Sequence, residues 1–415
     1  MLNYPMTKTA LLTLERLAYG GTSLGRLEDG RAVFVPFALP GERVRVRLVD
    51  ERRGFVHAEL LEVLEAAAGR IAPKCPHFGQ CGGCHYQHMP YAEQCQAKTR
   101  ILRDQLERIG KIETPPLQPM LPAPKAWNYR NRLQFHLTPD GRLGFQSPGA
   151  TQIVPIDECH LPEAALNDLW PHLEFEPGAP FTRVSILTDS NGDLMLILES
   201  GTAAPPNLEL EADISVVHLF DGNALVLAGS EHLTMKILNR SFRLSAGSFF
   251  QVNTSMAEEM VKHVQSLLPQ QIETLLDIYC GVGLFSAFLA PRCQRLIGIE
   301  ISPPACEDFV VNLDAFDHVE LYEAPAEICL PVLAEQITAP VCAVLDPPRA
   351  GLEKQVVDAL QVLAPEQIVY ISCDPSTLAR DARRLIAGGY HLKQVTPFDL
   401  FPQTYHIESI SLFEK

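Results

Sequence analysis

The sequence holds 415 residues, 47% of them hydrophobic, and its 34 Lys and Arg against 50 Asp and Glu give a net charge of −16. This length predicts two or three domains, and the acidic balance argues against a chain wholly devoted to nucleic-acid binding. No run of about 18 apolar residues suggests a membrane helix. The first residues lack a signal-peptide pattern, so we expect a cytoplasmic protein whose 11 cysteines are reduced thiols, metal ligands or catalysts.

Charge is unevenly distributed along the chain. Residues 1–135 contain 19 Lys and Arg against 13 Asp and Glu, whereas the remainder contains 15 against 37. A local basic surface is sufficient for phosphate binding, whatever the total charge. The first 135 residues are therefore expected to hold an RNA partner.

Residues 11–64 have the pattern of a small all-β unit. Val44, Val46 and Leu48 alternate with Arg43, Arg45 and Arg47, and Pro40-Gly41 marks a turn. Short strands of this kind suit a five-stranded barrel, a fold that binds RNA along one face. The alternative is that the arginines are only the solvated side of an amphipathic strand.

A cysteine cluster follows the predicted barrel. Cys75, Cys81 and Cys84 have the spacing C-x5-C-x2-C, and Cys159 lies downstream. Four thiolates can bind either zinc or an iron–sulfur cluster, and the spacing does not choose between them. We interpret the nearby histidines as surface polar residues and the other cysteines, Cys373 excepted, as core or incidental thiols: His77, His85 and His88; Cys95, Cys280, Cys293, Cys306, Cys329 and Cys342.

Residues 91–109 form a basic helical pattern that ends at Gly110, and a Pro-rich connector leads into a β-rich segment that extends to about Leu244. Within that segment, the stretch 129–145 predicts a hairpin with a turn at Asp140-Gly141. From about Ser248 strands and helices alternate, which predicts a doubly wound parallel sheet.

The stretch TLLDIYCGVGLFSAFLA predicts a buried strand, a loop with Gly281 and Gly283, and a helix. Glu300 ends the next strand, where an acid can accept hydrogen bonds from ribose hydroxyls. The third glycine of the dinucleotide fingerprint is replaced by Ser286. S-adenosylmethionine is therefore preferred to a dinucleotide as the cofactor.

Three further strand ends hold residues that could take part in catalysis. Asp346 precedes two prolines that fix the orientation of its carboxylate, and Cys373 follows the strand 368–372. A thiolate that adds to carbon 6 of uracil activates carbon 5, and a base must then remove the carbon-5 proton. Glu408, at the start of the last strand, is our candidate base. Taken alone, Cys373 could be a buried hydrophobe and Glu408 a solvated edge-strand carboxylate.

The motifs FFQVN, DIYCGVGLF, GIE, DPPRAGL, YISCDPSTLARD and HIES resemble, in order and spacing, those of the RNA uracil-5-methyltransferases. That family includes the tRNA T-loop enzyme and the 23S rRNA enzymes related to RumA. The resemblance covers nearly the whole chain. It implies Cys373 as nucleophile, Glu408 as base, and the following residues around S-adenosylmethionine and uracil: Gln251, Tyr279, Gly281, Gly283, Glu300 and Asp346.

The resemblance also implies that Cys75, Cys81, Cys84 and Cys159 bind a [4Fe–4S] cluster with a structural role or a role in RNA folding. A radical S-adenosylmethionine enzyme is disfavoured, because its C-x3-C-x2-C motif leaves one iron open. Leu284 stands where related sequences place an asparagine near the cofactor, so we assign no contact there. Arg349 replaces the aromatic residue that amino-group methyltransferases place after their acid-Pro-Pro motif.

We therefore expect an α/β protein with a Rossmann-like S-adenosylmethionine methyltransferase domain, an N-terminal OB-like TRAM barrel and a β-rich central domain. The expected ranges are 1–66 for the TRAM barrel, 67–90 and 125–247 for the central domain with the cluster, and 91–124 and 248–415 for the catalytic domain. The expected partner is RNA, 23S rRNA in preference to tRNA, with no membrane contact and a monomeric chain. A non-catalytic iron–sulfur RNA-binding protein and an amino-methyltransferase remain the alternatives.

Overall fold

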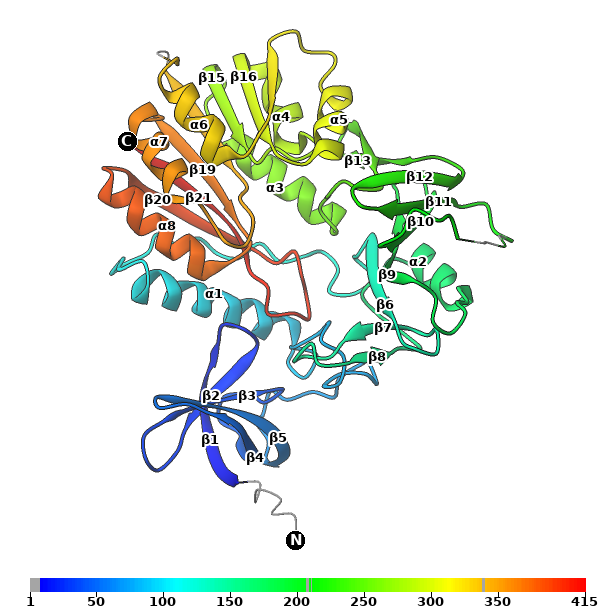
Figure 1. Ribbon diagram of the computed structural model, residues 1–415. Coiled ribbons are helices and arrows are strands. Elements are labelled where there is room, and N and C mark those ends of the chain that lie inside the picture. Colours follow the sequence, from blue (N-terminus) through cyan, green and yellow to red (C-terminus); the bar gives the residue numbers. More distant parts are fainter. Residues whose placement is uncertain (1–7, 207–208, 210, 338–339) are drawn as a thin grey trace. The chain divides into compact units, whose positions relative to one another are not determined.

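The computed structural model describes residues 8–206, 209, 211–337 and 340–415 (Figure 1). Two compact units are present. The first comprises Met1–Ile101, Gln146–Val154 and Phe401–His406, and the second comprises Leu102–Phe145, Pro155–Leu400 and Ile407–Lys415. The three-part division expected from the sequence stays a prediction.

The first unit contains a closed five-stranded barrel, as the sequence predicted. The strands are paired in the order β1-β2-β3-β5-β4. Alternation along the strands turns a cluster of valines and leucines inward, among them the fully buried Val33, Val46 and Val56. The strands are β1 (Thr9–Ala18), β2 (Thr22–Arg26), β3 (Ala32–Pro36), β4 (Arg43–Glu51) and β5 (Phe55–Glu65).

The arginines of β4 are not available as a free cationic face. Strand β5 pairs with β4 and places a glutamate beside each of them. The resulting ion pairs are Arg43 with Glu65 at 3.1 Å, Arg45 with Glu62 at 2.6 Å, and Arg47 with Glu59. The alternating arginines thus lie on the solvated side of an amphipathic strand, and this surface, which we call the Arg–Glu ladder, has no net charge.

A buried polar cluster lies elsewhere in the first unit. Helix α1 (Tyr91–Arg108) matches the predicted basic helix, but Lys98 is fully buried and donates to the Phe401 carbonyl at 3.0 Å. Gln94 and Gln403 bond each other twice at 2.9 Å, once through both side chains and once through the Gln403 amide. Lys98 therefore anchors the loop that holds Phe401, and its charge is not part of the exposed basic surface.

The second unit contains an irregular sheet in which β12, β11, β10, β9, β6 and β7 follow one another. Strands β6 and β7 form the predicted hairpin, and Gly141 takes a φ of 85° in its turn. Leu133, Val184 and Trp170 belong to the core of this sheet. The elements are β6 (Arg132–Leu137), β7 (Leu143–Gln146), β8 (Ile153–Pro155), α2 (Ala164–Leu169), η1 (Trp170–His172), β9 (Phe181–Thr188), β10 (Leu194–Ser200), β11 (Ser215–Phe220), β12 (Asn223–Ala228), and the separate pair β13 (His232–Ile237) and β14 (Arg240–Ser245).

The rest of the second unit is a seven-stranded sheet with the order β17-β16-β15-β18-β19-β21-β20. Strand β21 alone is antiparallel to its neighbours, and the remainder confirms the predicted doubly wound parallel sheet. The elements are α3 (Thr254–Leu267), β15 (Ile272–Ile278), α4 (Leu284–Leu289), η2 (Ala290–Arg292), β16 (Cys293–Glu300), α5 (Pro303–Asn312), β17 (Val319–Glu323), α6 (Ala326–Ala334), β18 (Val341–Leu345), α7 (Lys354–Leu363), β19 (Gln367–Ser372), α8 (Pro375–Ala387), β20 (His391–Phe398) and β21 (Glu408–Glu414).

The connector after α1 packs on this sheet. Leu117 and Leu121 form bridges with Val395 and Phe398 of β20, and Gln105 of α1 accepts a hydrogen bond from Ser376 of α8 at 3.3 Å. The connector and the end of α1 therefore contact α8 and β20, which lie more than two hundred residues further along the chain.

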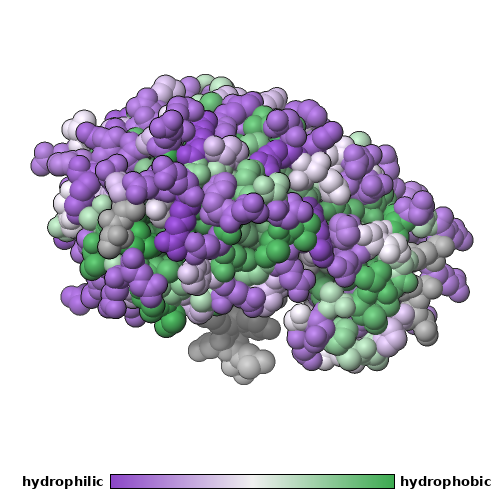
Figure 2. All heavy atoms as spheres, turned by 90° about the horizontal axis from the view of Figure 1, so that it is seen from above, coloured by the Kyte–Doolittle hydropathy of each residue, from purple (hydrophilic) through white to green (hydrophobic). Residues whose placement is uncertain are grey.

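In the part of the chain that the structure describes, no helix is long and apolar enough to cross a membrane. Figure 2 shows one face of the molecule, on which hydrophobic patches are separated by hydrophilic residues.

The barrel provides a test of which interactions stabilise it. Val46→Ala should lower the free energy of unfolding by about 2 kcal/mol, because it leaves a cavity in the core. Arg45→Ala should lower it by less than about 1 kcal/mol, since exposed ion pairs contribute little. Urea unfolding of both variants measures the difference, and equal losses would contradict the assignment of the ladder as a surface feature.

Candidate active site

The predicted site residues lie at one edge of the seven-stranded sheet. Glu300 is the last residue of β16, and the carboxyl ends of β15, β18 and β19 are followed by Tyr279, Asp346 and Cys373. Glu408 opens the antiparallel β21 beside β19. Between β15 and β18 the strand order reverses, and ligands of open α/β sheets bind at such a point. The cofactor candidates at these strand ends therefore flank the reversal, and Cys373 and Glu408 lie one and two strands beyond Asp346 in the strand order.

The pairing of β19 with β21 brings Cys373 and Glu408 together. The last pair in this ladder is Ser372 with Ser409. Because the strands are antiparallel, continuing the register by one residue sets Cys373 opposite Glu408. Glu408 is only 7% exposed, since β21 lies between β19 and β20. Its alternative interpretation as a solvated edge-strand carboxylate was wrong.

Negative charge surrounds the Cys373 thiol. Burial raises its pKa to about 12, the carboxylates of Glu408 and Asp346 add to the rise, and the Arg349 guanidinium opposes it. Cys373 is partly exposed and is therefore more than a core hydrophobe. A raised pKa favours the protonated thiol when no ligand is bound. The positive charge of Arg349 acts in the opposite direction and favours the thiolate.

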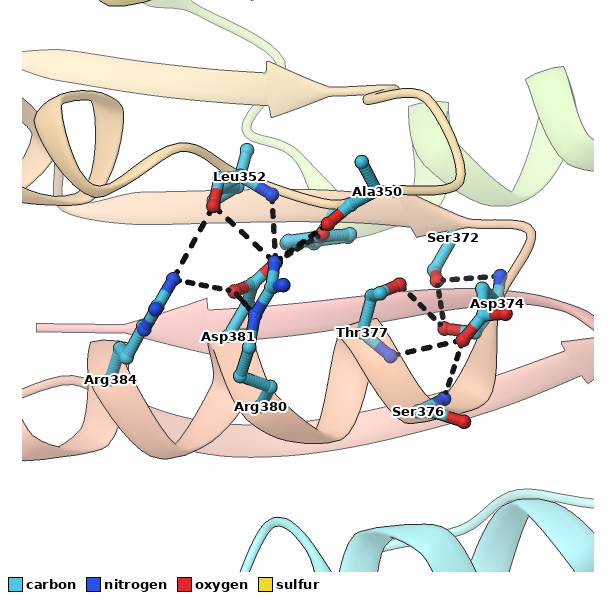
Figure 3. A network of polar contacts seen from close by, with 10 residues as sticks. Ala350, Leu352, Ser372, Asp374, Ser376, Thr377, Arg380, Asp381 and Arg384 are labelled. Carbon is cyan, nitrogen blue, oxygen red and sulfur yellow. Dashed lines mark hydrogen bonds and ion pairs between the residues drawn. The ribbon is translucent and has the colours of Figure 1, made fainter.

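The corner that carries Cys373 is fixed by hydrogen bonds on both sides (Figure 3). Asp374 caps α8, because its carboxylate accepts from the amides of Ser376 at 2.8 Å and Thr377 at 3.0 Å. The Ser372 hydroxyl donates to the Asp374 carbonyl at 3.0 Å. A strand end and a capped helix start thus hold the thiol from either side.

A buried carboxylate joins α8 to the loop of residues 346–353 between β18 and α7, which we call the Asp346 loop. Asp381 is fully buried and accepts from the Leu352 amide at 2.8 Å, the Tyr370 hydroxyl at 3.0 Å and the Arg380 Nε at 2.8 Å (Figure 3). Gly351 has a φ of 74°, and a Cβ there would lie 2.4 Å from Asp381 Oδ2. Sequence analysis missed these positioning residues, although the glycine and the Arg-Asp pair stand inside the quoted motifs DPPRAGL and YISCDPSTLARD.

The predicted cofactor loop has the geometry of a binding turn. Tyr279 takes a φ of 67°, which is strained for a side chain of its size. Glu300 accepts from the Gly281 amide at 2.9 Å and from the amides of Ile301 and Ser302 at 2.8 Å. A Cβ at Gly281 would meet nothing within 4 Å, so this backbone is open to a ligand.

Two carboxyl groups near this loop hold their protons unusually well. Burial raises the pKa of Asp277 to about 6, although Ser286 donates to it through its amide at 3.1 Å and its hydroxyl at 2.6 Å. Burial and the neighbouring carboxylates of Asp277 and Glu300 raise the pKa of Asp346 to about 7. Ser286, which replaces the third glycine, therefore has a hydrogen-bonding role that its sequence position did not suggest.

The remaining cofactor candidate, Gln251, lies in the segment between β14 and α3. Asn253 caps α3 and donates to the Leu400 carbonyl at 3.0 Å, which ties this segment to the loop after β20. The Gln251 carbonyl accepts from Asn131 at 3.1 Å. This hydrogen bond fixes the Gln251 backbone, and within the described part of the chain no hydrogen bond joins its side chain to the strand ends.

A basic pocket of about 600 Å³ lies beside that segment. Burial lowers the pKa of Arg132, Arg183 pairs with Glu199 at 3.5 Å, and the Arg130 Nε is buried without a hydrogen-bond partner in the described part of the chain. Phe249 is 69% exposed. The full lining is Arg130, Arg132, Gln134, Phe145, Arg183, Glu199, Leu219, Ala246, Gly247, Ser248, Phe249, Phe250 and Val252. Three arginines against one glutamate suit an anionic ligand.

The cysteine loop belongs to the first unit. The Gly83 amide donates to the Cys81 sulfur at 3.3 Å, and burial together with the nearby Cys75 raises the Cys81 pKa. Among the described residues, no group of three or more His, Cys, Asp or Glu is arranged to hold a metal ion. His88 is 1% exposed, so its interpretation as a surface residue was wrong. Burial also lowers the pKa of His85, to about 4.

Comparison with known proteins supports the assignment of the fold and class. The model of the tRNA (uracil-5-)-methyltransferase family matches residues 213–328 and 338–415, and the TRAM domain model matches residues 7–61. An uncharacterized RNA methyltransferase of Aquifex aeolicus is 36% identical, over 98% of this chain and 99% of its own length. One from Streptomyces avermitilis is 34% identical over 96% of both chains.

The structure of the Pyrococcus abyssi tRNA (uracil-54, C5)-methyltransferase in complex with S-adenosyl-L-homocysteine superimposes with a TM-score of 0.73. It is 23% identical and covers 97% of this chain and 100% of its own, which shows a shared fold. These matches define an RNA methyltransferase with a TRAM domain. The chain belongs to the RNA uracil-5-methyltransferase family.

Asp381 allows a test of the network that holds the Asp346 loop. Asp381→Ala should lower the free energy of unfolding by about 3 kcal/mol, because it leaves two arginines and a buried amide without their acceptor. The control is Asp358→Ala on α7, which removes an exposed ion pair with Lys354 and should cost less than about 1 kcal/mol. Similar urea midpoints for the two variants would contradict the role of Asp381.

Asp277 predicts a pH dependence of stability. Its pKa is raised from 3.8 to about 6 on folding, so between these values the unfolded chain releases a proton that the folded chain retains. The free energy of unfolding should therefore fall as the pH rises from about 4 to about 6. Asp277→Asn, which has no proton to release in this range, should reduce the fall relative to the wild-type chain. Urea unfolding at a series of pH values measures both, and an unaltered slope in Asp277→Asn would refute the assignment.

Proposed function

We propose that this chain methylates carbon 5 of a uridine in RNA, with Cys373 as nucleophile and Glu408 as base. The observation that carries the proposal is the register of β19 and β21. Extended by one residue, it sets Cys373 opposite Glu408 at the edge of the sheet where ligands bind. A pyrimidine ring between the two side chains would have the sulfur on carbon 6 and the carboxylate near carbon 5. The target uridine must leave its base stack to enter this position.

The proposed chemistry assigns one task to each group. The Cys373 thiolate adds to carbon 6, and the electrons of the carbon 5–carbon 6 double bond make carbon 5 nucleophilic. S-adenosylmethionine, when bound, supplies an electrophilic methyl group to that carbon. Glu408 then removes the carbon-5 proton, which restores the double bond and expels the thiolate. Because the Cys373 pKa is raised, Arg349 contributes by favouring the thiolate.

The residues around the glycine loop fit S-adenosylmethionine. Open space at Gly281 lets a ligand approach the backbone, and Glu300 stands at the end of the adjacent strand with its carboxylate oriented by three amides. We propose Tyr279, Gly281, Gly283, Glu300, Asp346 and Gln251 as the cofactor-binding set. Asp346, between the two halves of the site, can exchange a proton near neutral pH.

We propose 23S rRNA as the substrate in preference to tRNA, because the sequence resembles rRNA enzymes that combine a TRAM barrel with four cysteines. The basic pocket of Arg130, Arg132 and Arg183 would bind phosphates near the target. The tRNA alternative is favoured by the likeness to the Pyrococcus abyssi enzyme. Mass mapping of 5-methyluridine in both RNAs from a deletion strain distinguishes these substrates.

We also propose that Cys75, Cys81, Cys84 and Cys159 bind a [4Fe–4S] cluster. The proposal is supported by the spacing of the cysteines. It is also supported by the hydrogen bond that the Gly83 amide donates to the Cys81 sulfur, a contact common around thiolate ligands. The lack of a metal-binding group among the described residues counts against it. Stoichiometric iron and sulfide in anaerobically purified protein would support the cluster, and their absence from reconstituted protein would refute it.

The covalent mechanism is tested with RNA that contains 5-fluorouridine. The wild-type chain should form a denaturant-resistant complex with this RNA, because fluorine cannot be removed as a proton. Cys373→Ser should form no complex and lose methylation by at least about a thousandfold. Glu408→Gln should form a complex even with unmodified RNA, since the final elimination is blocked. Denaturing electrophoresis and methyl incorporation measure these outcomes.

The matched control is Cys95→Ser, which alters another partly exposed cysteine on α1 and should leave both readouts unchanged. Methylation by Cys373→Ser at the wild-type rate would refute the mechanism. Methylation without any trapped complex would instead favour an amino-methyltransferase, and RNA binding without methylation would favour a non-catalytic protein.

A further inference from the structure

An exposed aromatic cluster lies on the barrel outside the Arg–Glu ladder. The ring centroids of Phe34, Phe55 and His57 are 5.4 to 6.1 Å apart. The two phenylalanines meet edge to face, and the His57 ring is tilted by 32° from that of Phe34. We call these three residues the aromatic platform.

Strand pairing explains why the platform faces outward. Strands β3 and β5 are parallel, with Ala32 opposite Phe55 and Phe34 opposite His57. Side chains alternate along each strand, so the intervening Val33 and Val56 fill the barrel core while the three rings point away from it. Phe55 is 39% exposed, so part of its ring surface is accessible to a ligand.

The charges beside the platform differ from those of the ladder. The turn between β4 and β5 carries Arg52 and Arg53, and Gly54 separates them from Phe55. Arg52 pairs with Asp50 at 3.0 Å, whereas Arg53 forms no ion pair within the described residues. At the ladder, by contrast, each arginine has its own glutamate. Rings next to an available cation match a nucleic-acid strand, whose bases stack and whose phosphates attract cations.

We propose that Phe34, Phe55 and His57 form a stacking platform for unpaired bases of the RNA substrate, with Arg53 contacting the adjacent phosphate. The proposal rests on the proposed RNA-modifying function and adds the kind of RNA that the barrel recognises, namely a single-stranded segment. Stacking tolerates any base, because every base has a π-face, so the platform supplies affinity rather than sequence choice. The RNA-binding surface of the barrel is thus the face of β3 and β5 at the start of β5.

The test measures binding of the full chain to a single-stranded 12-mer and to a duplex of the same sequence. Phe55→Leu keeps an apolar side chain but removes the ring, and should weaken single-strand binding about tenfold with little effect on the duplex. Arg53→Gln should weaken it less and reduce its dependence on salt. In methylation assays Phe55→Leu should raise KM for RNA and leave kcat unchanged.

The control is Leu11→Ala on β1, which trims another exposed apolar side chain, 54% exposed and paired with Arg45 of the ladder. It should bind RNA like the wild type. Unchanged single-strand affinity in Phe55→Leu would overturn the platform and leave the methylation proposal intact. A platform variant that instead dissociates a dimer of this chain, with unaltered RNA binding, would also overturn it.

The two proposals fail separately. If the wild-type chain binds single-stranded RNA through Phe55 but never methylates uridine, the platform stands and the proposed reaction is wrong. Photo-crosslinking with a 4-thiouridine strand gives a second measurement that needs no variant, because the crosslinked peptide should contain Phe55 or His57. Crosslinks confined to β4 peptides of the ladder would contradict the proposal.

Discussion

The antiparallel pairing of β21 with β19 is the constraint on which the candidate site depends. A register shift of one residue would turn Glu408 to the other face of the sheet and separate it from Cys373. The pairing is well specified, because β21 is buried on both sides between β19 and β20. The relative position of the two proposed catalytic side chains is thus fixed by the backbone hydrogen bonds of the strand pair.

The same edge of the sheet concentrates negative charge in a poorly solvated place. Burial raises the pKa values of Asp346 and Cys373, and the charges of nearby carboxylates add to the rise: Asp277 and Glu300 for Asp346, Glu408 and Asp346 for Cys373. This clustering of carboxylates lowers the stability of the chain when no ligand is bound. A positively charged cofactor would offset their charge, and a carboxylate can accept the proton that the substrate ring must lose. The Asp381 network, by fixing the loop after Asp346, keeps this cost from being relieved by loop movement.

In the barrel, the number of basic residues does not give the amount of positive charge that is available at the surface. Its arginines are numerous, yet the β5 glutamates neutralise those of β4, and Lys98 further along is buried under a carbonyl. Aromatic rings and one available guanidinium distinguish another face. The count of basic residues predicted an RNA-binding region, and the pairing of strands decided which of its arginines lie beside a glutamate.

By itself the sequence determined the elements and their chemistry: the barrel, the alternating strands and helices, the glycine loop, and the thiol and acids at strand ends. These follow from local periodicity and from residue types that few structures tolerate, such as glycine at positive φ. Only the tertiary structure decided the inner position of β21, the partners of the arginines, and the roles of Asp381 and Asp277. Each depends on contacts between residues far apart in the chain, which local patterns cannot encode because the partner of a side chain is chosen by how strands pair and pack.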